Sequence, residues 1–97
     1  MTAAGTAEST KLIDNDRVTV WEWRFPKPGD NTGWHRHAYD YVIVPLSSGR
    51  LKVVTSEGST IEEGQAGVPY FCEKGEEHDV LNASDGGYGF IEIELKP

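Results

Sequence analysis

The sequence has little of several residue types, and each shortage excludes a class of protein. Its 97 residues include one cysteine, Cys72, which rules out an internal disulfide and suits a reducing compartment. Only 9 residues are Lys or Arg, against 16 Asp or Glu, and the formal net charge is −7. Without a basic cluster, nucleic acid and an anionic membrane are poor partners. No apolar run approaches the ~20 residues of a membrane-spanning helix, so we expect a cytoplasmic protein.

The N-terminus also lacks the features of a targeting segment. The opening MTAAGTAEST has neither the basic start nor the apolar core of a secretory signal. Its residues are small and polar, and we predict that residues 1–10 are disordered. Residues 11–97 then form one domain. A core of this size is thin, and a metal ion or a dimer interface would help to stabilise it.

Helical periodicity is missing as well, since no stretch of about twelve residues carries an apolar stripe with a 3.6-residue period. Apolar and polar residues instead alternate in short runs, such as RVTVWEWRF at 17–25 and YGFIEIEL at 88–95. About seven or eight such runs, with turn signals about every 8–12 residues, predict an all-β sandwich or barrel. An immunoglobulin-like sandwich and a double-sheet jelly roll are the two candidates.

Two segments carry more apolar surface than one barrel interior needs. The run YVIVPL at 41–46 is apolar on both faces. In the run at 17–25, Trp21, Trp23 and Phe25 share one face. We therefore predict that an outer sheet face is covered by a second subunit in a homodimer. The alternative is that N-terminal residues fold over this face.

The last predicted strand offers two carboxylates that could act as acid or base. Glu92 and Glu94 share one face of this strand, and the other face carries Ile91, Ile93 and Leu95. The apolar set competes better for the interior, so we predict that both glutamates point outward.

All three histidines can converge on one metal ion. His35 and His37 are two residues apart, and such residues on a strand share a face at a spacing of about 6.6–7 Å. Imidazoles so placed can both reach an ion at about 2.0–2.1 Å. His78 begins another predicted strand, which can lie across from the first in a barrel. The alternative is a metal-free cluster, but neutral imidazoles buried together need partners, and a metal is the simplest one.

The spacing of these residues resembles the two motifs of the cupin family, written G-x5-H-x-H-x3,4-E-x6-G and G-x5-P-x-G-x2-H-x3-N. In the first motif, Gly29, His35 and His37 match, while Tyr41 stands where the glutamate belongs. In the second motif the matching residues are Gly67, Gly75, His78 and Asn82, with Glu73 in place of the proline. The segment GWHRHAYDYVIVPLSSGRL also resembles very small cupins associated with β-alanine degradation.

This resemblance implies a single cupin domain, which is an antiparallel double-stranded β-helix or jelly-roll barrel. It also implies that His35, His37 and His78 hold one divalent transition metal ion. Three imidazoles suit Fe, Ni, Zn, Mn or Cu, and the sequence does not choose among them.

Tyr41 is the main departure from the family pattern and our candidate catalytic residue. Its spacing places it on the face of His35 and His37. One reading is a tyrosinate ligand, which requires the ion to remove a proton whose pKa is near 10. A second is a phenol that hydrogen-bonds a metal-bound water or the substrate, and a third is an ordinary barrel aromatic.

A three-histidine site without the carboxylate leaves coordination positions open for water, dioxygen or a chelating substrate. Such sites in the cupin family resemble those of non-haem iron dioxygenases. We therefore predict a metal-dependent, dioxygenase-like enzyme that acts on a small molecule, with an isomerase or lyase as a close variant. The alternative is a non-catalytic small-molecule or metal-binding cupin, accessory to a catabolic pathway, because no convincing acid or base accompanies the ligands. A purely structural metal in a small dimer is a third reading.

Overall fold

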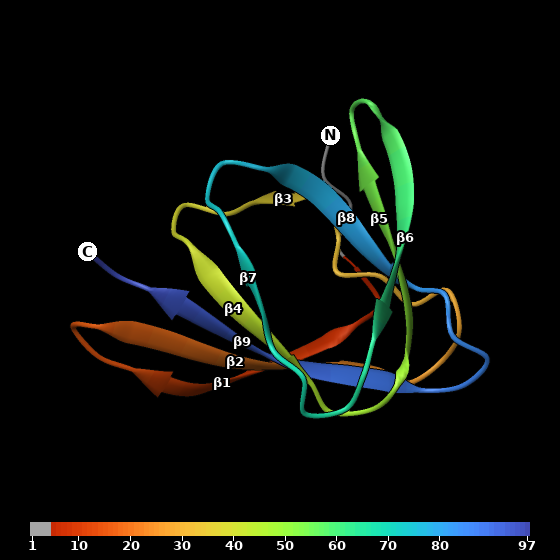
Figure 1. The fold of residues 1–97 in the computed structure, drawn as a ribbon, viewed down its shortest axis with the longest axis horizontal. Helices are drawn as coiled ribbons and strands as arrows, with labels where there is room; N and C mark the ends of the chain where they lie inside the picture. Colours follow the sequence, from red (N-terminus) through yellow and green to blue (C-terminus); the bar gives the residue numbers. More distant parts are fainter. Residues whose placement is uncertain (1–4) are drawn as a thin grey trace.

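The computed structural model describes residues 5–97, and within this range the chain is a two-sheet β structure (Figure 1). Its strands are β1 (Glu8–Asp14), β2 (Val18–Phe25), β3 (His35–Arg36), β4 (Tyr41–Pro45), β5 (Gly49–Thr55), β6 (Gly58–Gly64), β7 (Tyr70–Cys72), β8 (Glu77–Asn82) and β9 (Tyr88–Leu95). One sheet has the order β1-β2-β9-β4-β7, and the other has the order β3-β8-β5-β6. All described pairings are antiparallel. The all-β prediction is confirmed, and no helix able to cross a membrane occurs in this range.

The chain passes repeatedly between the two sheets, and the main core lies between them. After β4 the chain forms the β5–β6 hairpin in the second sheet and then alternates between the sheets through β7, β8 and β9, so residues distant in sequence meet across the interior. The inward side chains of both sheets form one cluster, consisting of Phe25, Tyr41, Ile43, Leu51, Val80, Tyr88 and Phe90. Apolar burial of this kind drives the two sheets together.

Glycines place two of the connecting turns. Gly29 and Gly75 have positive φ values of 86° and 102°, which residues with a Cβ rarely adopt. The Gly75 amide donates to the His37 carbonyl at 2.8 Å, and the Gly29 amide donates to the Asn82 carbonyl at 2.8 Å. Each turn thereby ties the loop that carries the first histidines to the strand that carries the third.

The N-terminal part of the chain is more ordered than the sequence indicates. Strand β1 begins at Glu8, so the domain boundary predicted at residue 11 lies inside a strand. Residues 1–4, also predicted to be disordered, lie outside the described residues. All seven β1 side chains are exposed, because this strand contacts the molecule through its pairing with β2 rather than through the core.

Two predicted strand faces are reversed, for one shared reason. Phe25 is completely buried and Trp23 packs against the core, so the aromatic face of β2 points inward rather than toward a second subunit. Strand β9 pairs with β2 in a register that joins Trp21 to Glu92, Trp23 to Phe90 and Phe25 to Tyr88. Cross-strand partners share a face, so Glu92 points inward, contrary to the prediction. Large aromatics, rather than the smaller Ile side chains, decided which face of β9 is buried.

Candidate metal centre

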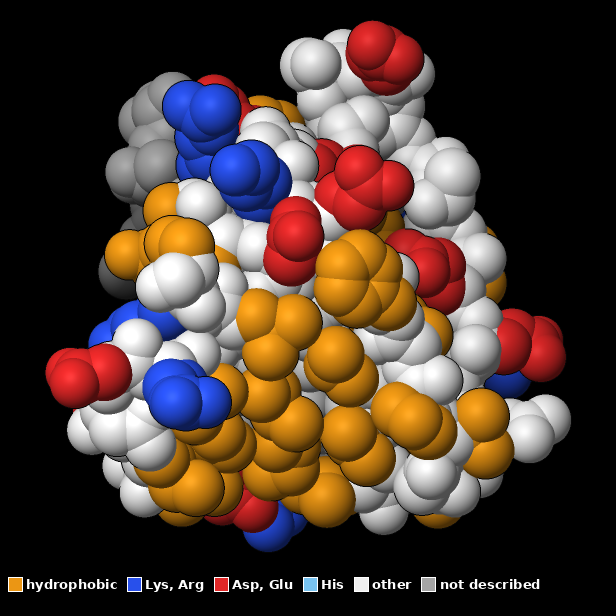
Figure 2. Space-filling view, turned by 60° about the vertical axis from the view of Figure 1, so that its left-hand side comes forward, with side chains coloured by type: hydrophobic (Ala, Val, Ile, Leu, Met, Phe, Trp, Pro, Cys, Tyr) orange, Lys and Arg blue, Asp and Glu red, His pale blue; other side chains and the backbone are white. Residues whose placement is uncertain are grey.

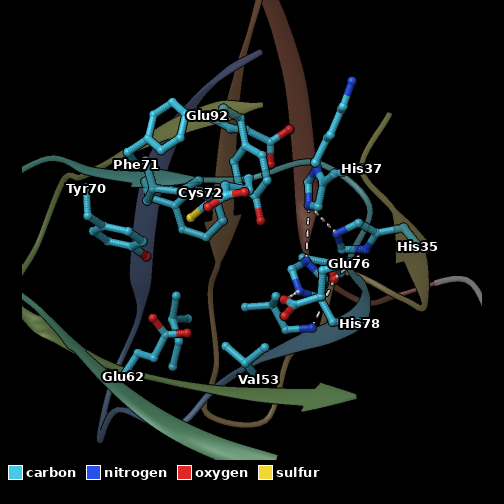
Figure 3. A pocket seen from close by; sticks show the side chains of 18 residues that line it. His35, His37, Val53, Glu62, Tyr70, Phe71, Cys72, Glu76, His78 and Glu92 are labelled. Carbon is cyan, nitrogen blue, oxygen red and sulfur yellow. Dashed lines mark hydrogen bonds and ion pairs between the residues drawn. The ribbon is translucent and has the colours of Figure 1, made fainter. Parts of the chain in front are cut away.

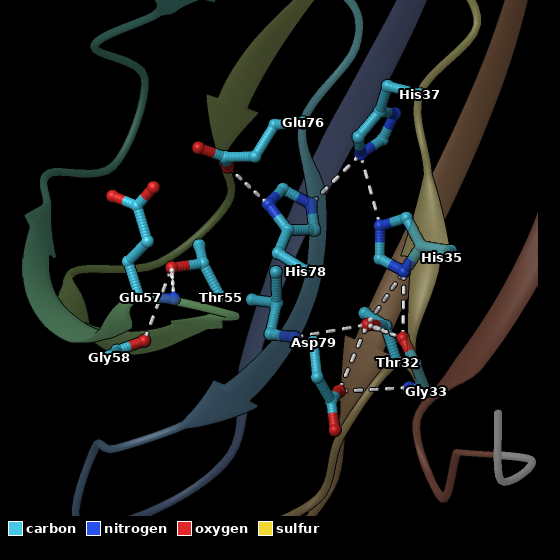
Figure 4. Close-up of polar contacts among 11 residues, drawn as sticks. Thr32, Gly33, His35, His37, Thr55, Glu57, Gly58, Glu76, His78 and Asp79 are labelled. Atoms are coloured by element: carbon cyan, nitrogen blue, oxygen red, sulfur yellow. Dashed lines mark hydrogen bonds and ion pairs between the residues drawn. The ribbon is translucent and has the colours of Figure 1, made fainter. Parts of the chain in front are cut away.

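The three histidines meet near one end of the space between the sheets, as the sequence predicts (Figure 4). Strand β3 is only two residues long and pairs His35 directly with His78 of β8. His37 lies just beyond β3, where its amide donates to the Glu76 carbonyl at 3.3 Å and its carbonyl accepts from the Gly75 amide. These backbone contacts hold the loop so that all three imidazoles face one point.

The nitrogen atoms of the cluster are spaced as ligands of one ion would be. The Nε2 atom of His37 lies 3.0 Å from Nε2 of His35 and 3.1 Å from Nε2 of His78. An ion that binds nitrogen at about 2.1 Å places donors at right angles about 3.0 Å apart, and tetrahedral donors about 3.4 Å apart. The observed separations fit neighbouring positions of an octahedral or square-pyramidal ion.

The opposite ring nitrogens of two histidines are held by acceptors. Nδ1 of His35 lies 2.8 Å from the Gly33 carbonyl, and Nδ1 of His78 lies 2.5 Å from Oε1 of Glu76. Because a carbonyl or carboxylate accepts, each Nδ1 carries the proton and each Nε2 presents a bare lone pair. A proton on Nε2 of His37 could form a hydrogen bond to Nε2 of His35 or to Nε2 of His78, but not to both. A cation at the centre satisfies all three nitrogens, so the residues present fit a metal.

An aspartate network positions the loop before His35. Oδ1 of Asp79 accepts from the Gly33 amide at 3.1 Å, and Oδ2 accepts from Nδ2 of Asn31 at 3.0 Å. The Thr32 hydroxyl lies 3.3 Å from Nδ1 of His35 and accepts from the Val80 amide at 3.2 Å. This network fixes the orientation of His35 relative to β8.

Burial favours the neutral forms of His37 and His78. Burial, followed by the neighbouring His35 and His78 imidazoles, lowers the pKa of His37 to about 3. Burial also lowers the pKa of His78, although Glu76 acts in the opposite direction. Imidazoles bind metals in their neutral form, so protons compete little for this site near neutral pH.

The face of the Tyr41 ring, rather than its hydroxyl group, packs against the histidine cluster. Its ring stacks on His37 with centroids 3.9 Å apart and planes 23° apart, and the side chain is buried. Its cross-strand partner is Cys72 of β7. Burial, and then the neighbouring Cys72, raises the pKa of the Tyr41 hydroxyl above its usual value. The phenol therefore keeps its proton and can act as a hydrogen-bond donor.

A cavity of about 440 Å³ adjoins the histidines (Figure 3). Its apolar lining comes from both sheets and includes Ile43, Leu51, Val53, Val80 and Phe90. Its polar lining includes Tyr41, Tyr70, Cys72 and the carboxylates Glu62, Glu73, Glu76 and Glu92, with Lys74 as the one Lys or Arg among the described lining residues. A pocket that combines apolar walls from both sheets with convergent polar groups is typical of a small-molecule site.

Glu92 is a candidate acid or base inside the cavity, although the sequence analysis predicted that it points outward. This residue lines the cavity and is only 8% exposed. No hydrogen bond from residues 5–97 affects the pKa of its carboxyl group. Burial, and then the nearby Glu94, raises its pKa to about 7. One ligand atom each from Glu92, Glu94 and His37 fall within 4.8 Å of one another. Glu94 already accepts from Nε1 of Trp21 at 3.0 Å, so Glu92 is the free carboxylate of this group.

Glu76 and Asp79 were also missed. Glu76 lies just before β8, two residues from His78, and this short spacing was the available signal for it. Asp79 had no local signal, because its partners lie 46–48 residues away in sequence.

The fold, with three histidines at the inner end of its cavity, defines a cupin. No family model matches the chain. The chain is 46% identical over 96 residues to the β-alanine degradation protein BauB of Pseudomonas aeruginosa, covering 99% of this chain and 100% of that protein. It is 49% identical to a cupin domain from Bordetella pertussis, whose crystal structure matches with a TM-score of 0.91 over 98% of each chain. The chain therefore belongs to the cupin family, and specifically to its small single-domain members.

More distant structures share the fold alone. The polyketide cyclase RemF from Streptomyces resistomycificus is 23% identical, with a TM-score of 0.71 over 97% of this chain and 70% of that one. A predicted oxalate decarboxylase from Thermotoga maritima is 20% identical, with a TM-score of 0.70 over 94% and 81%. The different activities in these names show that the fold does not specify one reaction.

Proposed function

We propose that the protein is a metal-dependent enzyme that acts on a small molecule, with His35, His37 and His78 holding one divalent transition metal ion. The observation that carries this proposal is the convergence of three Nε2 atoms, two pairs of which are 3.0 and 3.1 Å apart. When bound, such an ion supplies a Lewis acid and open positions for a chelating substrate or dioxygen.

The surrounding residues have separate roles in this proposal. Glu76 holds the His78 ring in the tautomer that leaves Nε2 free. Tyr41 donates its hydroxyl proton in a hydrogen bond to the bound molecule, which is the second of the three roles open to it. Glu92 exchanges a proton with the bound molecule at its carboxylate, since its pKa of about 7 suits that task near neutral pH.

The dioxygenase-like reaction follows from the resemblance to cupins that lack the motif glutamate. The likeness to a β-alanine degradation protein supports a role in the breakdown of a small metabolite. A cytoplasmic location remains a prediction. A purely structural metal is less well supported, because a cavity of about 440 Å³ adjoins the histidines.

The alternative is a cupin that binds a small molecule or metal without turnover. Glu92 favours the enzyme, because a buried carboxylate beside the metal ligands supplies the proton-transfer group that catalysis requires. Turnover by the metal-loaded protein that is lost in Glu92→Gln even at saturating ligand would support the enzyme. Binding of the same ligands without any turnover would support the alternative.

The first test is elemental analysis of untagged protein, with His37→Ala and His78→Ala beside it. We expect about one equivalent of a transition metal in the parent and none in either variant. Arg36→Ala is the matched control, because Arg36 lies between two ligands in sequence but is exposed. Failure of the parent to bind Fe, Ni, Zn, Mn or Cu after reconstitution would overturn the proposal. If the metal is iron, oxygen uptake with small substrates is the next measurement.

A further inference from the structure

Carboxylates from several walls of the cavity face the same space. Glu92 comes from β9, Glu62 from β6 and Glu76 from the start of β8. Figure 3 shows Glu92 and Glu62 on opposite sides of the pocket, with the histidines along a third side. The pocket is therefore acidic, apart from Lys74 and any metal ion.

Glu92 is the buried carboxylate of this set, because Glu62 and Glu76 are exposed. Glu76 is paired with His78, and Glu94 behind it with Trp21. Glu92 is more than nine-tenths buried, and no hydrogen bond from residues 5–97 affects the pKa of its carboxyl group. A buried carboxylate is costly unless it is paired, and a cation is the partner that compensates best.

We propose that the pocket takes a small molecule that carries an ammonium or similar organic cation, with the cation on Glu92 and the metal-binding end on the histidines. The inference rests on the proposed function, because the metal holds the other end. Glu92 and His37 have ligand atoms within 4.8 Å of each other, so only a short spacer of about two or three atoms separates the two ends of the molecule. Glu62 adds a second negative wall that disfavours anionic molecules.

Three matched hydroxamic acids test this proposal, because hydroxamate chelates a metal and the far end can be varied. The probes are 3-aminopropanohydroxamic acid, butanohydroxamic acid and succinic monohydroxamic acid, which end in ammonium, methyl and carboxylate. Calorimetry on the metal-loaded protein should give an affinity about tenfold higher for the ammonium probe than for the methyl probe, and the lowest for the carboxylate probe.

In Glu92→Gln the ammonium preference should fall to about one, while affinity for the methyl probe stays within about twofold of the parent. Glu22→Gln, outside the pocket, is the control and should change nothing. Equal affinity of the parent for the ammonium and methyl probes, or no binding of any probe, would overturn the cation site. If metal removal and His78→Ala both leave the affinities of all three probes unchanged while the ammonium preference persists, the metal site is overturned and the cation site stands.

A separate observation concerns the outer face of the five-stranded sheet. The pairings place one apolar residue from each strand in a continuous row, namely Phe71, Val42, Ile93, Val20 and Ile13 from β7, β4, β9, β2 and β1. Val44 and Ile91 form a pair beside it. Figure 2 shows a broad apolar area on this side of the molecule, with charged side chains around it. At the ends of the row, Phe71 and Ile13 are 58% and 48% exposed.

We infer that this face binds a second copy of the chain, as the homodimer prediction requires, although through residues other than Trp23 and Phe25. The five strands have 7, 8, 8, 5 and 3 residues, and at about 3.4 Å per residue and 4.8 Å between strands they present a flat face of roughly 500 Å². A standard interface buries about 800 Å² on each partner, so this face makes up most of one. The row carries no charge, so two copies can meet there although each has a net charge of −7.

Sedimentation velocity tests the dimer. The parent should sediment at twice its 10.7 kDa mass, and Ile93→Glu and Phe71→Glu should each sediment as monomers. Ile61→Glu is the matched control, because Ile61 is 57% exposed but lies on β6 of the other sheet, and it should remain dimeric. A monomeric parent at about 50 μM, or dimeric Phe71→Glu, would overturn the inference. Phe71 borders the cavity but is exposed, so its replacement tests the interface without removing a core residue, and Ile93→Glu tests it from a strand in the middle of the sheet.

Discussion

Replacing Glu76 tests how the site holds its ligands. The Glu76 carboxylate accepts the Nδ1 proton of His78 at 2.5 Å, while about half of its side chain (53%) is exposed. Exposure limits its contribution to stability, because solvent screens the pair. Its effect on the metal is larger, because without it His78 is free to rotate or to adopt the other tautomer. Loss of such a partner lowers metal affinity about 10–100-fold, or about 1.4–2.7 kcal/mol.

We therefore expect Glu76→Ala to weaken metal binding by that factor and leave the thermal midpoint of the metal-free protein within a few degrees of the parent. Competition against a chromophoric chelator measures the affinity. Glu77→Ala is the control, because the neighbouring carboxylate contacts Nε1 of Trp34 at 3.2 Å rather than a histidine. If Glu76→Ala binds metal as tightly as Glu77→Ala, Glu76 does not set the His78 tautomer.

Three further predictions concern stability. The folded pKa of Glu92 is raised to about 7 from 4.5, so the folded state binds more protons and the metal-free parent loses stability as pH rises from about 4.5 through 7. Glu92→Gln should remove this loss, of ~3 kcal/mol, in urea unfolding at several pH values, and an unchanged pH profile would contradict the burial of the carboxylate. Asn82 is 3% exposed, and its amide donates to the carbonyls of Lys27 and Gly86 and accepts from the Ser84 amide. Asn82→Ala should lower the free energy of unfolding by ~3–4 kcal/mol, and a loss below about 1 kcal/mol would show that these bonds are replaced by water. The buried Tyr88 hydroxyl has no hydrogen-bond partner among the described residues, so Tyr88→Phe should leave the thermal midpoint unchanged or raise it, and a large drop would reveal a hidden partner.

The histidine cluster was predictable because short, fixed spacings in the sequence identify its members. Two histidines at a spacing of two share a face of any extended segment, and the motif spacing identified His78 as the third member. The glycines of the same motifs were predictable for a related reason, since Gly29 and Gly75 occupy turns whose positive φ values favour glycine. Asn82 of the second motif donates to the carbonyls of Lys27 and Gly86, which ties the loops after β2 and before β9 to β8.

The direction of each strand face was not local information. Alternation separates Glu92 from Ile91 and Ile93, but it does not say which set points inward. The apolar content of the two faces predicted that the isoleucines point inward. The structure instead buries Glu92, because Tyr88 and Phe90 on the same face pack with Phe25 across the sheet. The same register moved the outer apolar face from Trp23 and Phe25 to Val42 and Ile93.

The amino-acid sequence by itself determined the all-β class, the turns and the identity of the three histidines, because these depend on side-chain period, backbone conformation and short spacings. Only the tertiary structure decided that Glu76 orients His78, that Glu92 lies unpaired in the cavity and that a continuous apolar row crosses the outer sheet. Each of these depends on strand register or on which face is buried. Register is set by packing among residues far apart in the chain, where a shift of one position exchanges the inner and outer faces.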